Sequence, residues 1–125
     1  MSVELNHIIV PAHDKQAAAE FLAGILDLEV GEPTGPFVPV TLSNSVTLDY
    51  MNRAEFHSQH CAFKLTEQEF DAAFARIEAA GLTYWADPGH QEPGRIGTRW
   101  GGRGVYFLDP GGHNMEILTR TPDDE

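Results

Sequence analysis

The sequence has little cysteine, few cations and no long apolar run, and each shortage excludes a class of protein. Its single cysteine, Cys61, excludes an internal disulfide and any zinc site built from several thiolates. Only 8 lysines and arginines stand against 19 aspartates and glutamates, a formal net charge of -11. Because nucleic acids and anionic membranes attract clustered cations, this balance argues against either as a partner. No apolar run approaches the ~20 residues that cross a bilayer, and the first residues resemble no signal peptide. We therefore expect a soluble, cytoplasmic protein.

The 125 residues, 42% of them hydrophobic, are enough for one ordinary domain with a core. In the first half, Pro11 ends a β-rich run and Asp14 is a candidate N-cap for a helix whose apolar residues recur at helical spacing. The predicted order is a strand at 5–10, a helix after Asp14 with its apolar residues at 17–25, and strands at 37–42 and 46–51, with a further strand near 28–30.

The second half repeats this plan. Residues 66–69 form a capping-box sequence that opens a second helix, and Gly81 is placed to end it. The predicted strands are 60–65, 83–86, 105–108 and 114–119, with a long loop over 87–102.

Overlaying the halves at an offset of 53 places His7 on His60 and Phe21 on Phe74. The last strands correspond at an offset of 67, because the second loop is longer. The sequence therefore predicts an α+β fold of two tandem βαβββ modules, about 1–55 and 56–125. Curved mixed sheets would enclose a cavity for a metal or ligand, with the helices outside.

Strand alternation predicts which polar side chains enter this cavity. Apolar residues that a helix would cover alternate with His7, with His60 and with Glu116, so these three side chains are expected to point inward from separate strands. Two imidazoles and a carboxylate suit a divalent metal such as Zn, Ni, Mn or Fe and leave coordination positions open. Asp49 joins them if Leu48 takes the helix side.

Three segments resemble the vicinal oxygen chelate superfamily, which includes glyoxalase I, extradiol dioxygenases, fosfomycin-resistance enzymes and bleomycin-resistance proteins. They are LNHI at 5–8, HCAF at 60–63 and YFLDPGGHNME at 106–116, and the likeness covers the whole chain as a single domain. By this resemblance His7, His60 and Glu116 are the metal ligands, and Asp49 stands near the place of a further glutamate in glyoxalase I. The resemblance also implies a homodimer.

The resemblance leaves the reaction open. A glyoxalase-like lyase or isomerase, acting on a small oxygenated substrate that chelates the metal through two oxygens, needs a base such as Glu116 or Asp49. An extradiol-type ring-cleaving dioxygenase needs a nearby His or Tyr, and Tyr106 is the candidate. A fosfomycin-type thiol transferase is disfavoured because Gly104 stands where a serine is expected. A ligand- or drug-sequestering protein of the bleomycin-resistance type is the alternative without turnover.

The loop over 87–102 is long enough to act as a lid. Arg95, Arg99 and Arg103 are concentrated in and just after it, in an acidic chain, and are candidates for binding an anionic substrate together with Tyr106. The remaining histidines are expected to have structural or surface roles: His113 stabilises a turn, and His13, His57 and His90 lie in loops.

Overall fold

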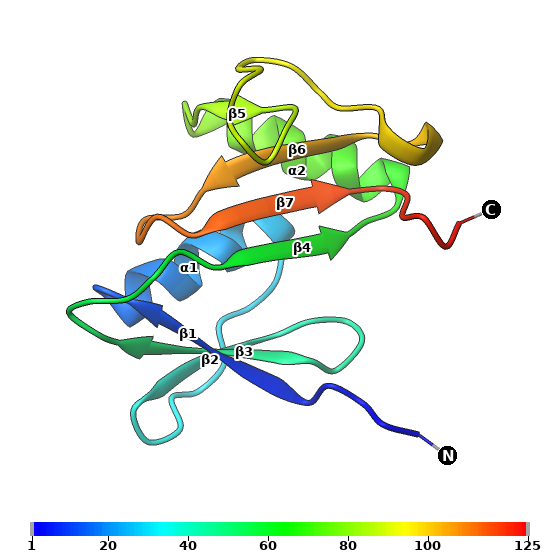
Figure 1. Cartoon of the computed structure of the whole chain (residues 1–125). Coiled ribbons are helices and arrows are strands. Elements are labelled where there is room, and N and C mark those ends of the chain that lie inside the picture. The colour runs from blue at the N-terminus through cyan, green and yellow to red at the C-terminus, as the bar shows by residue number, and fades with distance from the viewer. Residues whose placement is uncertain (1, 125) are drawn as a thin grey trace. The chain divides into compact units, whose positions relative to one another are not determined.

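Each half of the chain folds as a strand, a helix and further strands, as the periodicity predicts. The computed structural model describes residues 2–124, which divide between His57 and Ser58 into two units (Figure 1). No helix among residues 2–124 is both long and apolar enough to cross a membrane.

The first unit contains β1 (His7–Ala12), α1 (Lys15–Leu26), β2 (Phe37–Thr41) and β3 (Thr47–Asn52). The strands form a sheet in the order β1-β3-β2, in which β1 is parallel and β2 antiparallel to β3. The Asp14 side chain caps α1 by accepting the N–H of Ala17, and α1 contacts all three strands. The core is formed by alternate strand residues and the helix stripe, including Val10, Val38, Val40, Leu48, Tyr50 and Leu22.

Two expectations for this unit need correction. Pro11 does not end the first strand, because β1 lies at the edge of the sheet and the missing N–H of proline costs no ladder bond there. The strand expected near 28–30 is reduced to a single antiparallel bridge between Val30 and Val40.

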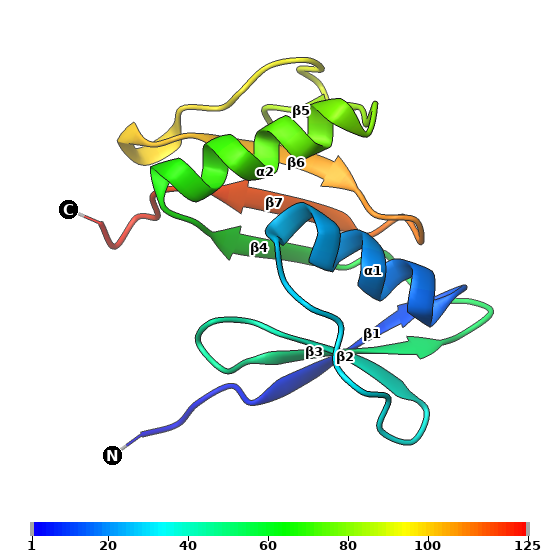
Figure 2. The same ribbon diagram turned by 180° about the vertical axis from the view of Figure 1, so that it is seen from behind.

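The second unit contains β4 (His60–Lys64), α2 (Glu67–Ala79), β5 (Tyr84–Trp85), η1 (Arg99–Gly101), β6 (Gly104–Leu108) and β7 (Asn114–Leu118). Its sheet has the order β4-β7-β6-β5, and α2 lies across one face of it (Figure 2). In the first unit the Val30 bridge occupies the position that β5 occupies in the second, so both units have the same strand order. The predicted α+β fold of two βαβββ modules is therefore confirmed.

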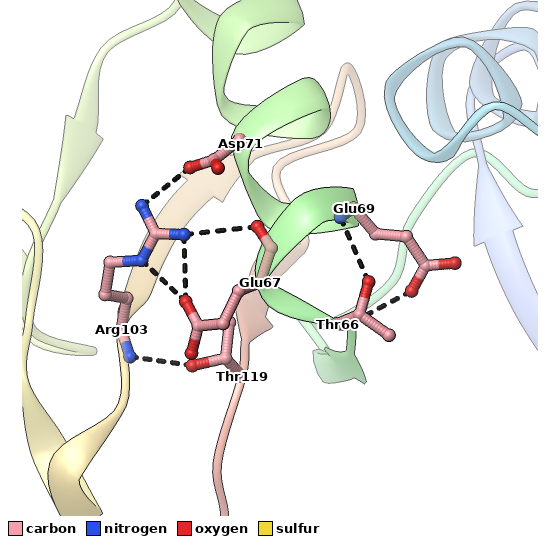
Figure 3. A network of polar contacts seen from close by, with 6 residues as sticks. All are labelled: Thr66, Glu67, Glu69, Asp71, Arg103 and Thr119. Carbon is pink, nitrogen blue, oxygen red and sulfur yellow. Dashed lines mark hydrogen bonds and ion pairs between the residues drawn. The ribbon is translucent and has the colours of Figure 1, made fainter.

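The start of α2 is held from two directions (Figure 3). Thr66 and Glu69 form the predicted capping box, with bonds of 3.1 and 2.9 Å. Arg103, just before β6, places Nη1 2.8 Å from Asp71 and Nε 2.9 Å from Glu67. Its guanidinium also lies 4.5 Å from the centre of the Phe70 ring. These contacts join the helix to the beginning of β6.

Candidate functional site

The two faces of the second sheet differ in chemistry. On one face, Tyr84 meets Phe74 of α2 edge to face at 4.9 Å, which identifies the helix side. The opposite face, which we call the site face, carries the alternate residues of the same strands. These are His60, Ala62 and Lys64 of β4, Asn114, Glu116 and Leu118 of β7, Gly104, Tyr106 and Leu108 of β6, and Trp85 of β5.

His60 and Glu116 meet on the site face. The Nε2 atom of His60 lies 2.9 Å from Oε1 of Glu116. The histidine side chain is 47% exposed, whereas the glutamate side chain is only 11% exposed. A carboxylate removed from water needs a charged or hydrogen-bonding partner. In this pair the carboxylate is therefore largely buried, and the imidazole is accessible to solvent.

Tyr106 borders this pair. It is the β6 residue directly opposite Glu116, and its ring centre lies 5.5 Å from that of His60. Burial, followed by the negative charge of Glu116 and a hydrogen bond with it, raises the pKa of Tyr106 to about 12. The phenol therefore keeps its proton at neutral pH and can donate a hydrogen bond, but it is a poor base.

A pocket lies between the site face and the end of the long loop. Arg99 and Trp100 of η1 line one side of it, and Gly104, Tyr106 and Glu116 line the other. Arg99 lies 5.4 Å from the centre of the Trp100 ring, and its charge opposes the rise in the pKa of Tyr106. The predicted loop thus brings a cation and an aromatic ring beside the Glu116 carboxylate.

The three arginines predicted to bind substrate occupy different settings. Arg99 lines the pocket, and no ion pair to it occurs among residues 2–124. Arg95 lines a second hollow, formed by the loop itself between Asp87 and Arg99. Although Arg103 also lines the first pocket, its guanidinium is held by Glu67 and Asp71 on α2. Arg99 is thus the arginine best placed to meet a ligand beside Glu116.

His7 and Asp49 belong to the first unit. Both lie on the same face of its sheet, on neighbouring strands, with Ile9 paired to Asp49. Asn6 Oδ1 accepts a hydrogen bond from Nδ1 of His7 at 2.8 Å, which leaves Nε2 as the acceptor nitrogen. Within each unit, the described residues bring no three histidine, cysteine or acidic side chains close enough to share a metal ion. Of the three predicted metal ligands, His60 and Glu116 are in contact in the second unit, and His7 lies in the first unit.

Sequence reasoning missed the role of two rings at the site. His90 was expected in a surface loop, but its ring stacks on Trp85 of the site face, with centres 3.8 Å apart. The position of Trp85 in the predicted strand over 83–86 could have indicated an aromatic ring on the same face as Tyr106. His113 is fully buried: its backbone N–H donates to Oδ1 of Asp109 across the turn at 2.8 Å, and its Nδ1 accepts the Gln59 N–H, outside the turn, at 2.9 Å.

Known proteins similar to this chain were found by sequence and by structure. The model of the Glyoxalase/Bleomycin resistance protein/Dioxygenase superfamily matches residues 4–117. The solved structure of Oxidase ChaP-H2 is 58% identical and covers 97% of this chain and 96% of its own, with a TM-score of 0.95. Oxidase ChaP-H1 is 52% identical over 98% of this chain and 99% of its own, also with a TM-score of 0.95. The Glutathione transferase FosA of Serratia marcescens is 29% identical over 94% of this chain and 81% of its own.

Proposed function

Because the chain belongs to the Glyoxalase/Bleomycin resistance protein/Dioxygenase superfamily, we propose that it is a metal-dependent enzyme that oxidises a small oxygenated substrate with dioxygen. The observation that carries this proposal is the His60–Glu116 pair, with 2.9 Å between Nε2 and Oε1 on the site face. Similarity above 50% identity to two proteins named oxidases favours oxidation over the glyoxalase-like lyase or isomerase reaction.

The donor set fits a divalent transition metal. An imidazole and a carboxylate lie 2.9 Å apart, and the imidazole is half exposed, so a cation that displaces the proton between them can reach both. When bound, iron or manganese would supply Lewis acidity and electron exchange with dioxygen, whereas zinc or nickel would supply Lewis acidity alone. The proposed oxidation therefore favours iron or manganese among the four predicted metals.

His7 is the proposed third ligand. Its Nδ1 hydrogen bond to Asn6 orients the ring and leaves Nε2 with a free lone pair, which is the usual state of a metal-binding histidine. Asp49 is proposed as a polar contact near His7.

We further propose a homodimer, and mixing His7→Ala with Glu116→Ala protein tests whether one site uses both chains. Metal binding regained in the mixture would support a shared site, and none regained would place each site in one chain.

The other polar residues are assigned to the substrate. Tyr106 stays protonated, so it donates a hydrogen bond to Glu116 or to a substrate oxygen rather than removing a proton. Arg99 in the pocket provides a positive charge for an anionic oxygen of the substrate. Arg95 is the candidate for a more distant contact along the loop. Glu116 is the proposed base if the reaction requires one.

Oxygen uptake tests the proposal. Protein loaded anaerobically with Fe(II) is mixed with aerated buffer and a panel of catechols, hydroquinones and phenols, with Zn(II)-loaded protein and Glu116→Ala as controls. We expect substrate-dependent uptake with Fe(II) in the wild type alone. A nitric oxide probe makes a negative panel informative, because an iron site open to dioxygen also binds nitric oxide and gives a characteristic EPR signal. Absence of this EPR signal would contradict the oxidative function. Turnover of the hemithioacetal of methylglyoxal and glutathione without oxygen uptake would support the lyase instead.

A further inference from the structure

His90 has a backbone conformation that residues other than glycine seldom adopt. Its φ is +60°, in the left-handed region, where histidine is found more often than most residues that bear a Cβ. The loop holds it there: the His90 N–H donates to the Asp87 carbonyl at 3.2 Å. Strained residues persist only where their surroundings determine them, and they are frequent in ligand-binding sites. The conformation of His90 is therefore set by the contacts of the loop around it.

The Asp87 side chain fixes this turn. Its Oδ1 accepts the backbone N–H groups of Gln91 at 2.9 Å and of Glu92 at 2.8 Å. The bond from Gln91, with that from Glu92, lowers the pKa of the Asp87 carboxyl. The carboxylate is therefore ionised at neutral pH, and the turn that presents His90 is intact.

The His90 ring makes two directed contacts. It lies parallel to the Trp85 indole, at 3.8 Å between centres and 7° between planes. Its Nε2 lies 2.9 Å from Oδ1 of Asn114, whose Nδ2 donates to the Pro88 carbonyl at 3.2 Å. Because the amide nitrogen is used by Pro88, Oδ1 must accept, and Nε2 of His90 is the donor. The loop is thus bound to the sheet through both His90 and Asn114.

These contacts place His90 across the site face. Trp85 of β5 is paired with Tyr106 of β6, which is paired with Glu116 of β7. Asn114 is two residues before Glu116 and is paired with His60 of β4. One imidazole therefore connects a residue beside Tyr106 with a residue beside His60, and it fixes the plane of the Trp85 ring.

We propose that His90 is a positioning residue of this site: through its contacts with Trp85 and Asn114 it holds the Trp85 ring, which we call the aromatic wall, beside Tyr106 at the margin of the pocket that Tyr106 and Glu116 line. The inference takes the presence of a substrate from the proposed function, but the contacts that hold the Trp85 ring involve no metal. If His90 only completed the loop, the Trp85 ring and ligand affinity would be independent of its side chain.

The first experiment observes the wall in metal-free protein. The chain has 2 tryptophans, so labelling with 5-fluorotryptophan gives two ¹⁹F NMR signals, which Trp100→Phe assigns. Replacing the stacked ring in His90→Ala should move the Trp85 signal and leave that of Trp100 in place. His90→Asn should do the same, because asparagine tolerates a positive φ but cannot stack. His57→Ala, which removes an exposed histidine, is the control and should move neither signal.

The second experiment measures ligand affinity. The probe is 4-nitrocatechol, a flat ligand with two neighbouring oxygens, titrated anaerobically into Fe(II)-loaded protein and followed by its absorbance. Loss of one ordered aromatic wall should weaken its binding about fivefold to tenfold in His90→Ala and His90→Asn. His90→Phe, which keeps a stacking ring but not the bond to Asn114, should lose less. Bound metal should be equal in all these variants, because His90 is not a proposed ligand.

The outcomes separate this inference from the proposed function. An unchanged Trp85 signal, or probe affinity within twofold of the wild type in both variants, would overturn the role of His90. If the wild type bound neither iron nor 4-nitrocatechol, the proposed function would fail. The Trp85 signal would then decide alone whether His90 holds this wall.

Discussion

The Nε2 atom of His60 and the Oε1 atom of Glu116 lie 2.9 Å apart, on β4 and β7 of one sheet. The two strands are parallel, and Glu116 is paired with Ala62, two residues after His60 on the same side of β4. The register of the two strands therefore brings these side chains within reach of each other. A bound cation would find both donors already positioned, so metal binding should stabilise the folded state.

The first prediction concerns that stabilisation. Mn²⁺ at about 100 times its Kd should raise the free energy of unfolding of the wild type by about 2.7 kcal/mol. The gain should disappear in His60→Ala and in Glu116→Ala, because each removes a donor. Thermal unfolding with and without Mn²⁺ measures it. Glu78→Gln, which changes an exposed glutamate on α2, is the control and should keep the full gain. Equal stabilisation of Glu116→Ala would locate the metal elsewhere.

A second prediction concerns Arg103, which was expected to bind substrate. Its guanidinium lies over Phe70 and pairs with Glu67 and Asp71, so Arg103→Ala should mainly lower stability, by about 1 kcal/mol from the ring contact. The part due to the ion pairs should shrink in high salt. Urea unfolding at two salt concentrations measures both. Arg53→Ala, at an exposed position of the first unit, should have no such effect. A large loss of 4-nitrocatechol affinity at unchanged stability would return Arg103 to the site.

A third prediction compares two glycines beside the pocket. A Cβ at Gly102 would lie 2.6 Å from Oγ1 of Thr119, which is also held by the Arg103 N–H, so Gly102→Ala should lose about 1–3 kcal/mol of stability. A Cβ at Gly104 meets nothing closer than 3.5 Å and lies 3.9 Å from Oε2 of Glu116.

Gly104→Ala should therefore fold with normal stability, yet weaken 4-nitrocatechol binding by narrowing the pocket beside Glu116. Thermal unfolding and the absorbance titration on both variants measure the contrast. Normal probe affinity in Gly104→Ala would show that the ligand does not use this part of the pocket.

A fourth prediction concerns acid stability. The Lys64 ammonium, 2.8 Å from Oδ1 of Asp124, and the backbone N–H of Thr121 lower the pKa of the Asp124 carboxyl to about 2. Because an unfolded aspartate has a pKa of about 3.9, this contribution to stability is complete above about pH 4 and is lost as the pH falls toward 2. Asp124→Asn should flatten that part of the pH profile of thermal unfolding, and Lys64→Met should flatten it similarly. A profile identical to that of the wild type would contradict the assignment.

Much of the fold could be predicted because its signals are local. The Thr66–Glu69 capping box, the Asp14 cap and the glycine at 81, which has a φ of +71°, all act within a few residues. The register confirms the overlay of the halves, since Asp49 is opposite Pro39 as Glu116 is opposite Tyr106. Pro11 was misread because edge position depends on the whole sheet.

The site was only partly predictable, for a related reason. Alternation placed His60 and Glu116 on one face because that rule depends only on the strand containing each residue. His90 and Asn114 are 24 residues apart, and their bond depends on a turn set by Asp87 and on a stacked Trp85. Such contacts arise from tertiary packing, and no local periodicity encodes them. The same is true of Arg103, whose ion pairs with α2 distinguish it from Arg99.

The most direct test of the central claim is the metal content of untagged protein, by elemental analysis of the wild type beside Glu116→Ala. We predict near-stoichiometric iron or manganese in the wild type and its loss in the variant, with Glu78→Gln retaining it. Bound zinc or nickel would keep the metal site but contradict the oxidative chemistry. No metal in the wild type, even after anaerobic reconstitution, would contradict the account and leave a ligand-binding protein.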